Sequence, residues 1–348
     1  MNIFNTGLSH PTINSCKIIA EIGVNHCGDI ALAKRMILAA KESGADAVKF
    51  QTFSAKKLAT KKTLKVPYQL QFSSADESHF EMLEKLELSY KAHEDLYEFC
   101  LKANIEFLST PYDVESAKFL TSLGCNLIKT ASADIVDIPL HEYLASTNLK
   151  VLIATGMATL FEVELCLNIY GMKNLQYITL LHCVSNYPCS DHSLNLNAIK
   201  TLRNKFNCDV GFSDHSAGNE AALISRALGA TVIEKHFTTN KSLPGPDQRA
   251  SSNPVEFSEL VKLIRRGEVM LGNADKLCQP EELQMSLTSR KSLTLNKSLS
   301  AGSIIRREDL ILKRPGTGIY YAYIDKVVGA KINKDLDCDS QPTWEDLF

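Results

Sequence analysis

Short apolar runs alternate with longer amphipathic stretches from Lys17 to Leu271. Most of the runs are continuously apolar, as is typical of strands buried on both faces of a parallel sheet. The eight runs are Lys17–Gly23, Asp46–Phe53, Ile105–Asp113, Leu127–Ser132, Val151–Met157, Ile178–Cys183, Asp209–His215 and Thr231–Thr238. A helical pattern follows each run, and eight such units predict a (β/α)₈ barrel, the TIM barrel.

The first helix has the clearest boundaries. Asp29 is a good N-cap residue, apolar side chains then recur at helical spacing, and Gly44 is suited to end the helix. An open doubly wound sheet is the competing fold. It normally carries a glycine-rich phosphate-binding fingerprint after its first strand, and the stretch Gly23–Gly28 does not fit one.

Two segments depart from the regular alternation. Residues 54–74 form a long insertion after the second predicted strand, and insertions of this length at the carboxyl face of a barrel are more often functional than idle. Beyond the last helical pattern the chain becomes polar and rich in turns. We therefore predict a barrel over residues 1–274, a linker over 275–288 and a small β-rich domain over 289–348. In this last domain we expect strands at Lys291–Leu295 and 303–305, and short helices at Arg307–Leu310 and Tyr323–Val327.

Composition excludes several classes of function. The chain has 348 residues, of which 45% are hydrophobic and 22% charged, and its formal net charge is −2. This charge gives no reason to expect a nucleic acid or a membrane surface as a partner. The sequence contains no run of about 18 apolar residues, the length needed to span a bilayer. The ten cysteines are scattered, and the N-terminus lacks the pattern of a signal peptide, so we expect reduced thiols and a cytoplasmic protein.

Two histidines give the strongest chemical signal. His215 and His236 end consecutive predicted strands, with a short helical segment, 219–228, between them. A right-handed crossover makes the two strands parallel neighbours, so both imidazoles lie at the same carboxyl edge and can share one ion. Two ligands with open positions suit a divalent ion that also binds substrate oxygens, and the identity of the metal stays open. The alternative is two polar strand ends packed in a core.

Further polar side chains gather at the other predicted strand ends, where reactive groups of barrels lie. Lys49 and Lys129 would be unpaired buried charges unless an anion meets them. With nearby hydroxyls they predict a cradle for a phosphate and a carboxylate; the hydroxyls are Thr110, Ser132, Thr155, Ser185 and Ser213. Two alternatives remain: each lysine pairs with an acid such as Glu21 or Asp134, or one lysine forms a Schiff base.

A series of motifs along almost the whole chain resembles the sialic acid synthase family, which includes N-acetylneuraminate synthases and, as close relatives, legionaminic acid synthases. The motifs are Glu21-Ile-Gly-Val-Asn-His26, Val48-Lys-Phe-Gln-Thr52, Phe107-Leu-Ser-Thr-Pro-Tyr112, Thr155-Gly-Met157, Leu180-Leu-His-Cys183, Phe212-Ser-Asp-His215, Ile233-Glu-Lys-His-Phe-Thr238, Gly245-Pro-Asp247, Arg290-Lys-Ser-Leu293 and Lys313-Arg-Pro-Gly-Thr-Gly-Ile319. The resemblance implies a barrel followed by an antifreeze-like (SAF) domain, and a domain-swapped homodimer.

The same resemblance implies a reaction. Phosphoenolpyruvate condenses with the open-chain aldehyde of an N-acetylated hexosamine, giving a nine-carbon 2-keto acid and phosphate with cleavage of a carbon–oxygen bond. The metal is usually manganese, with magnesium or cobalt as alternatives. Our first hypothesis is N-acetylmannosamine as the sugar and N-acetylneuraminate as the product. The alternatives are legionaminic acid synthesis from 2,4-diacetamido-2,4,6-trideoxymannose and, more distantly, an inactive carbohydrate-binding barrel.

The resemblance also implies roles for individual residues. His215 and His236 would hold the metal, and Glu21 and Asp134 would be proton-transfer groups. The residues expected to bind phosphoenolpyruvate are Lys49, Thr110, Lys129, Ser132, Ser185 and Ser213, and Thr155 stays a substrate-binding candidate from its place at a strand end. Those expected to bind the sugar are Gln51, Tyr187, Asp247 and, from the partner subunit in the swapped dimer, the residue at the position of Arg314.

The chain departs from the family's pattern at several positions near these residues. Cys27 stands where an asparagine is usual, Ala133-Asp134 replaces Gly-Glu, Ala154 replaces a serine, and Gln248 stands where a histidine is common. None of these changes removes a predicted metal ligand or lysine. They leave the identity of the sugar open.

Overall fold

The computed structural model describes residues 15–65 and 77–348. The N-terminal segment that bears on a signal peptide, and the second half of the insertion predicted at 54–74, lie outside the described residues. The chain forms two compact units, Met1–Gly272 and Asn273–Phe348. Each unit is described by itself below.

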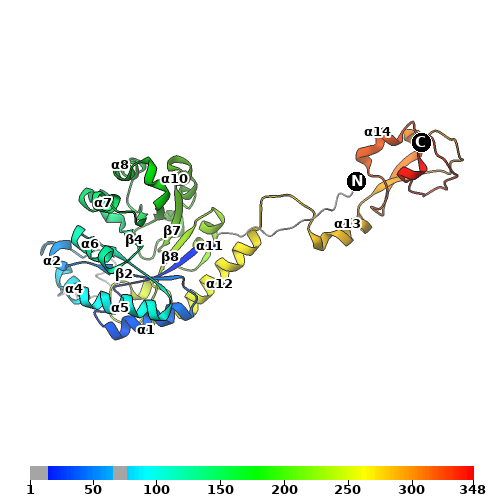
Figure 1. Ribbon diagram of the computed structural model, residues 1–348. Helices are drawn as coiled ribbons and strands as arrows, with labels where there is room; N and C mark the ends of the chain where they lie inside the picture. Colours follow the sequence, from blue (N-terminus) through cyan, green and yellow to red (C-terminus); the bar gives the residue numbers. More distant parts are fainter. Residues whose placement is uncertain (1–14, 66–76) are drawn as a thin grey trace. The chain divides into compact units, whose positions relative to one another are not determined.

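The first unit is a closed barrel of eight parallel strands in sequential order, which confirms the predicted fold (Figure 1). The strands are β1 (Lys17–Gly23), β2 (Ala47–Thr52), β3 (Glu106–Pro111), β4 (Leu127–Thr130), β5 (Lys150–Ala154), β6 (Ile178–Cys183), β7 (Asp209–Asp214) and β8 (Val232–His236). The ring closes because β1 pairs with β2 on one side and with β8 on the other. The first and last strands are therefore neighbours.

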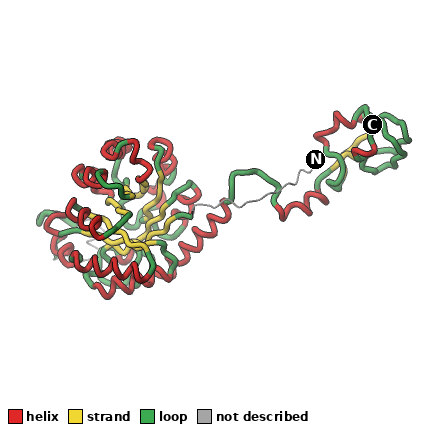
Figure 2. Tube along the Cα trace, viewed as in Figure 1, coloured by secondary structure: helices red, strands yellow, loops and turns green. Residues whose placement is uncertain are grey.

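Helices surround the strands and cover their outer faces (Figure 2). They are α1 (Ile30–Glu42), α2 (Ala55–Leu58), α4 (His79–Leu86), α5 (Tyr90–Ala103), α6 (Val114–Leu123), α7 (Ile138–Ala145), α8 (Leu160–Tyr170), α9 (Asp191–Leu194), α10 (Ala198–Phe206), α11 (Glu220–Ala227) and α12 (Pro254–Leu271). As predicted, the Asp29 carboxylate caps α1, accepting hydrogen bonds from the backbone N–H groups of Ala31 at 2.7 Å and Leu32 at 3.2 Å. Among the described helices, none combines the length and the apolar character that crossing a membrane requires.

The alternation of side chains along each strand divides the barrel interior into layers. Ile19, Leu108, Leu127 and Val232 belong to one buried apolar cluster inside the barrel. Two residues further along the same strands, on the same face, come Glu21, Thr110, Lys129 and Glu234. The apolar layer therefore forms a floor, and the polar layer above it opens at the carboxyl ends of the strands, where barrel enzymes carry their active sites.

The second unit is small and has its own apolar core, which includes Leu293, Leu295, Ile305 and Val327. Its elements are α13 (Leu283–Ser289), β9 (Ser292–Leu295), β10 (Leu310–Lys313) and α14 (Ile324–Val327), with β9 and β10 antiparallel. The predicted strand at 303–305 forms only an isolated bridge, between Ile304 and Lys331. Strand β10 was not predicted, because we read Leu310 as the end of a helix rather than the start of a strand.

Candidate active site

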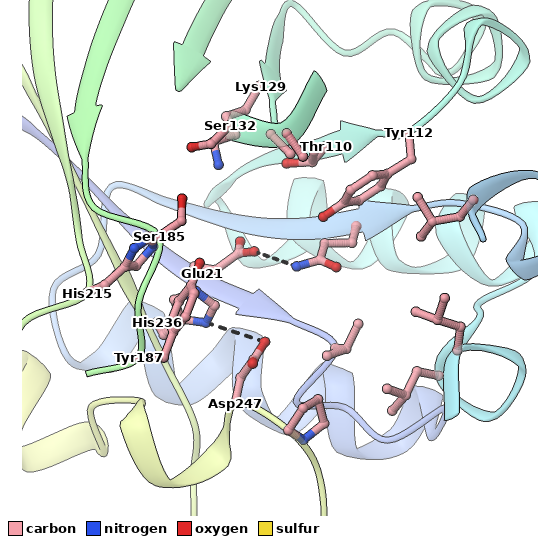
Figure 3. Close-up of a pocket in the computed structure, with 18 of the residues that line it drawn as sticks. Glu21, Thr110, Tyr112, Lys129, Ser132, Ser185, Tyr187, His215, His236 and Asp247 are labelled. Carbon is pink, nitrogen blue, oxygen red and sulfur yellow. Dashed lines mark hydrogen bonds and ion pairs between the residues drawn. The ribbon is translucent and has the colours of Figure 1, made fainter. Parts of the chain in front are cut away.

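A cavity of about 360 Å³ opens at the carboxyl end of the barrel (Figure 3). It brings together eleven of the residues predicted from sequence: Glu21, Lys49, Gln51, Thr110, Lys129, Ser132, Ser185, Tyr187, His215, His236 and Asp247. They come from strands β1 to β4 and β8, and from the loops after β4, β6, β7 and β8. A single cavity therefore gathers side chains that are far apart in sequence.

The two histidines lie side by side, with ring centroids 5.6 Å apart. Strands β7 and β8 are parallel neighbours, as predicted, and pair Ser213 with Glu234. Nδ1 of His215 lies 2.8 Å from the carbonyl oxygen of Val184. Because a carbonyl only accepts, Nδ1 carries the hydrogen, and Nε2 of the neutral ring keeps its lone pair.

His236 provides a second lone-pair donor. Its Nδ1 atom is buried and has no hydrogen-bond partner among the residues that the structure describes. The Oδ2 atom of Asp247 lies 3.9 Å from this nitrogen (Figure 3). The ring centroids of Tyr187 and His236 are 5.3 Å apart. Burial lowers the pKa of His236 well below its usual value, and the nearby His215 lowers it further. Burial likewise lowers the pKa of His215 to about 4, so both imidazoles are neutral near pH 7.

Four buried charges form a cluster beside the histidines. The Nζ atom of Lys49 lies 2.7 Å from Oε2 of Glu21 and 3.7 Å from Oε2 of Glu234. Lys129 Nζ lies 3.4 Å from Oε1 of Glu234. Two cations and two anions make the cluster neutral overall, which is how so many charges can be buried together.

The environment divides the roles of the two carboxyls. Burial raises the pKa of Glu21, and this effect outweighs the opposing influence of Lys49. For Glu234, burial is outweighed by Lys129 and Lys49, which hold the pKa at about 2. Burial lowers the pKa of Lys129, but the carboxylates of Glu234 and Glu21 reverse this and raise it. Glu234 is thus a permanent anion, and Glu21 is better suited to exchange a proton.

Glu234 was missed by the sequence analysis. Strand β8 alternates, so Glu234 and His236 point to the same face. The signal was therefore present: a carboxylate two residues before a predicted metal ligand in a strand. Glu234 also accepts a hydrogen bond from the Ser213 hydroxyl at 2.9 Å.

Hydroxyl groups converge on the turn after β5. The backbone N–H of Gly156 donates to Ser132 Oγ at 3.1 Å, and Ser132 Oγ lies 3.0 Å from the thiol of Cys183. A Cβ atom at position 156 would lie 2.4 Å from Ser185 Oγ. Only glycine allows this close approach, which keeps the two serine hydroxyls on one side of the cavity, where they can donate hydrogen bonds to an anion.

Four predicted site residues do not line the cavity. Thr155 donates its hydroxyl hydrogen to the carbonyl of Leu181 at 3.0 Å, and Ser213 donates its own to Glu234. Asp134 lies in the short helix η1 (Ser132–Val136); burial raises its pKa to about 6, and its Oδ2 atom has no hydrogen-bond partner among the described residues. Arg314 is an exposed residue of the second unit.

An apolar wall forms the other side of the cavity. It consists of Val24, Leu58, Ala59, Met82, Leu83 and Leu86. Three of these residues come from α4, which begins with a capping box between Ser78 and Glu81 that fixes the helix start. The wall belongs to an apolar cluster separate from the barrel core. The cavity therefore has a charged half, which the sequence predicts, and an apolar half, which it does not.

Comparison with known proteins assigns both units. The model of the NeuB family matches residues 36–276, and the SAF domain matches residues 290–347. N,N'-diacetyllegionaminic acid synthase of Legionella pneumophila is 44% identical, covering 96% of this chain and 95% of the relative. The synthase of the same name from Campylobacter jejuni is 43% identical, covering 91% and 97%. The crystal structure of N-acetylneuraminic acid (sialic acid) synthetase from Leptospira borgpetersenii serovar Hardjo-bovis has a TM-score of 0.69 and 36% identity, covering 78% of this chain and 90% of that one.

Proposed function

The chain belongs to the NeuB family, and from this premise we propose that it condenses phosphoenolpyruvate with the open-chain aldehyde of an N-acetylated hexosamine. The products are a nine-carbon 2-keto acid and inorganic phosphate. The observation that carries the proposal is one cavity in which Lys49 and Lys129 lie beside two neutral imidazoles. The lysines suit an anionic enol ester, and the imidazoles suit a divalent cation.

The two histidines fit a divalent cation. Both rings are neutral, and each has a nitrogen lone pair that no hydrogen-bond donor of the described chain occupies at normal distance. Among the described residues no group of three or more His, Cys, Asp or Glu side chains is arranged to hold a metal. We assign His215 and His236 as the protein ligands because their rings lie 5.6 Å apart, centroid to centroid, in one cavity, with the remaining positions left to substrate and water. When bound, the cation polarises the sugar aldehyde as a Lewis acid.

The remaining groups act on phosphoenolpyruvate. Lys49 and Lys129 are cationic hydrogen-bond donors to its phosphate and carboxylate groups, and the hydroxyls of Thr110, Ser132 and Ser185 add hydrogen bonds. Lys49 is held toward this region by a 3.0 Å hydrogen bond to Thr110 Oγ1. After C3 of the enol ester has bonded to the aldehyde carbon, Glu21 takes a proton from the water that adds to C2, and a proton is taken up by the former aldehyde oxygen, which becomes a hydroxyl. The bond between C2 and the phosphate oxygen then breaks, the C2 hydroxyl gives its proton to the departing phosphate, and a keto group remains at C2.

The choice of sugar divides the family. The two most similar relatives named above are legionaminic acid synthases, whereas the solved sialic acid synthetase is less similar to this chain. The apolar wall gives an independent reason to prefer a deoxy sugar, because a methyl group buries favourably against leucine and methionine whereas a hydroxyl there loses hydrogen bonds to water. We therefore place 2,4-diacetamido-2,4,6-trideoxymannose ahead of N-acetylmannosamine.

An assay of phosphate release from phosphoenolpyruvate tests both levels of the proposal. We expect release that needs a sugar and a divalent metal and stops with a chelator. Across N-acetylmannosamine, its 6-deoxy analogue and the diacetamido sugar, we expect kcat/KM to rise by about 10–100-fold from the first to the last. No release with any of the three sugars contradicts the reaction; a preference for N-acetylmannosamine contradicts only the choice of sugar.

We further propose that the protein acts as a domain-swapped homodimer in which Arg314 meets the sugar in the partner's cavity. The change Arg314→Ala should then raise the KM for the sugar about tenfold, because a charged donor to the sugar is lost. At sugar concentrations well below the KM, Arg314→Ala subunits mixed with His236→Ala subunits should reach about a quarter of wild-type activity, since half of the dimers then contain one intact site. No gain after verified subunit exchange would rule out sharing.

A further inference from the structure

We infer that Gln248 is a positioning residue that fixes Asp247 in the cavity by joining the turn after β1 to the loop after β8. The inference rests on the proposed function and deepens it, because Asp247 is one of the groups assigned to the sugar. Gln248 comes directly after Asp247, is the first residue of the short helix η3 (Gln248–Ala250), and is completely buried. Gln248 itself does not line the cavity.

Both ends of the Gln248 amide are engaged. Its Nε2 atom donates to the backbone carbonyl of Asn25 at 2.8 Å, and it lies 3.4 Å from the thiol sulfur of Cys27. Its Oε1 atom accepts from the hydroxyl of Thr238 at 2.5 Å. The orientation of the amide is therefore fixed, since a flipped amide would set its oxygen against the Asn25 carbonyl.

Neighbouring bonds tie the same two segments together. The side-chain amide of Asn25 donates to the carbonyl of Phe237 at 2.9 Å and to Ser251 Oγ at 2.8 Å. Ser251 Oγ in turn donates to the backbone carbonyl of Asp247 at 2.7 Å. The thiol of Cys27 donates to the carbonyl of Pro244 at 2.9 Å. These bonds hold the chain on both sides of Asp247.

The network is buried and built from uncharged groups. Asn25, Thr238 and Ser251 are each at most 1% exposed. Removing one partner from such a network leaves another polar group buried without a bond, so the arrangement is strongly preferred over alternatives. This network holds the backbone of Asp247, and the Asp247 carboxylate then lies in the cavity with its Oδ2 atom 3.9 Å from Nδ1 of His236.

The conformation of Cys27 adds to the argument. Its backbone lies in the left-handed region, with φ of 52°, which residues other than glycine and asparagine seldom adopt. In this conformation the thiol of Cys27 contacts both the side-chain amide of Gln248 and the backbone carbonyl of Pro244. A small side chain that both donates and accepts suits the position.

The test is Gln248→Glu. The substitution keeps the shape of the side chain and the oxygen that accepts from Thr238, but it replaces the amide donor with an oxygen that repels the Asn25 carbonyl. We expect the KM for the sugar to rise at least about tenfold, while the KM for phosphoenolpyruvate changes less than about twofold. Adding Asp247→Asn to this variant should have little further effect, because the carboxylate is already displaced. Gln284→Glu, the same change at an exposed position of α13, should leave both constants unchanged.

Other results overturn the inference. Equal increases in both KM values, unchanged KM values, or full additivity with Asp247→Asn would each show that Gln248 does not position the sugar-binding carboxylate. If Gln248→Glu does not fold, Ser251→Ala removes the bond to the Asp247 carbonyl and should show the same selective effect, with the same criteria. A crystal structure of either variant gives a readout without activity: Asp247 should move away from His236. That readout stands even if the wild-type protein releases no phosphate with any sugar.

Discussion

His236→Ala is expected to lower metal-dependent phosphate release by a factor of about a thousand or more. The substitution removes one of the two protein ligands assigned to the cation. Lewis-acid activation is worth several kcal/mol of transition-state stabilisation, and each 1.4 kcal/mol is about a factor of ten in rate. The measurement is the steady-state rate of phosphate release at saturating manganese, together with manganese affinity by calorimetry.

Two further variants make this result specific. His192 is an exposed histidine in α9, and His192→Ala should retain wild-type rate and metal affinity. His215→Ala should resemble His236→Ala, and the double variant should be scarcely worse than either, because both act through the same ion. Retained metal-dependent turnover in a folded His236→Ala protein would refute the assignment of the ligands.

Lys49→Met is expected to reduce both activity and stability. Glu21, 2.7 Å from Lys49, would lose its partner in the interior. Breaking a buried ion pair by removing one partner costs about 3–5 kcal/mol of unfolding free energy, because the remaining charge has no compensation. Turnover should fall at least about a hundredfold, since Lys49 is one of the two cationic donors proposed to hold phosphoenolpyruvate. Urea denaturation and the phosphate assay measure the two effects.

The barrel contains a matched control for this substitution. Lys235 is also a buried lysine, on β8, and its Nζ atom lies 2.6 Å from Asp214 Oδ2, but it does not line the active-site cavity. Lys235→Met should therefore lose comparable stability and keep most of the activity of the folded protein. Adding Glu21→Gln to Lys49→Met should recover part of the stability and none of the turnover. Equal losses of activity in both lysine variants would mean that Lys49 has only a structural role.

The order and type of the barrel elements were predictable because buried parallel strands are marked by continuous apolar runs. The neighbouring positions of His215 and His236 followed from the handedness of strand–helix–strand connections. Strand β10 was harder, since Leu310–Lys313 is a short edge segment whose partner, β9, lies fifteen or more residues away in sequence. Local pattern does not specify such a pairing.

The sequence predicted which residues lie at the carboxyl ends of the strands, but not how their side chains pair with one another. Glu21, Lys49 and Lys129 could be placed at one rim, but their mutual pairing with Glu234 depends on side-chain distances around a closed ring. The apolar wall depends on how α4 packs after a long insertion, and the bonds of Gln248 depend on two loops that are 223 residues apart. Such contacts arise from tertiary packing, which no local sequence window contains.

The pairing of β1 with β8 also bears on how the protein is made. Glu21 is synthesised among the first residues of the barrel, and Glu234 and His236 among the last, so a nascent chain on the ribosome lacks a working catalytic centre until the final strand emerges. Such long-range closure folds slowly. A brief local opening of the seam between β1 and β8 would separate the Glu21–Lys49 pair on one side from Glu234 and His236 on the other. In hydrogen-exchange experiments, amide protection along this seam should therefore report on inactivation before the rest of the ring unfolds.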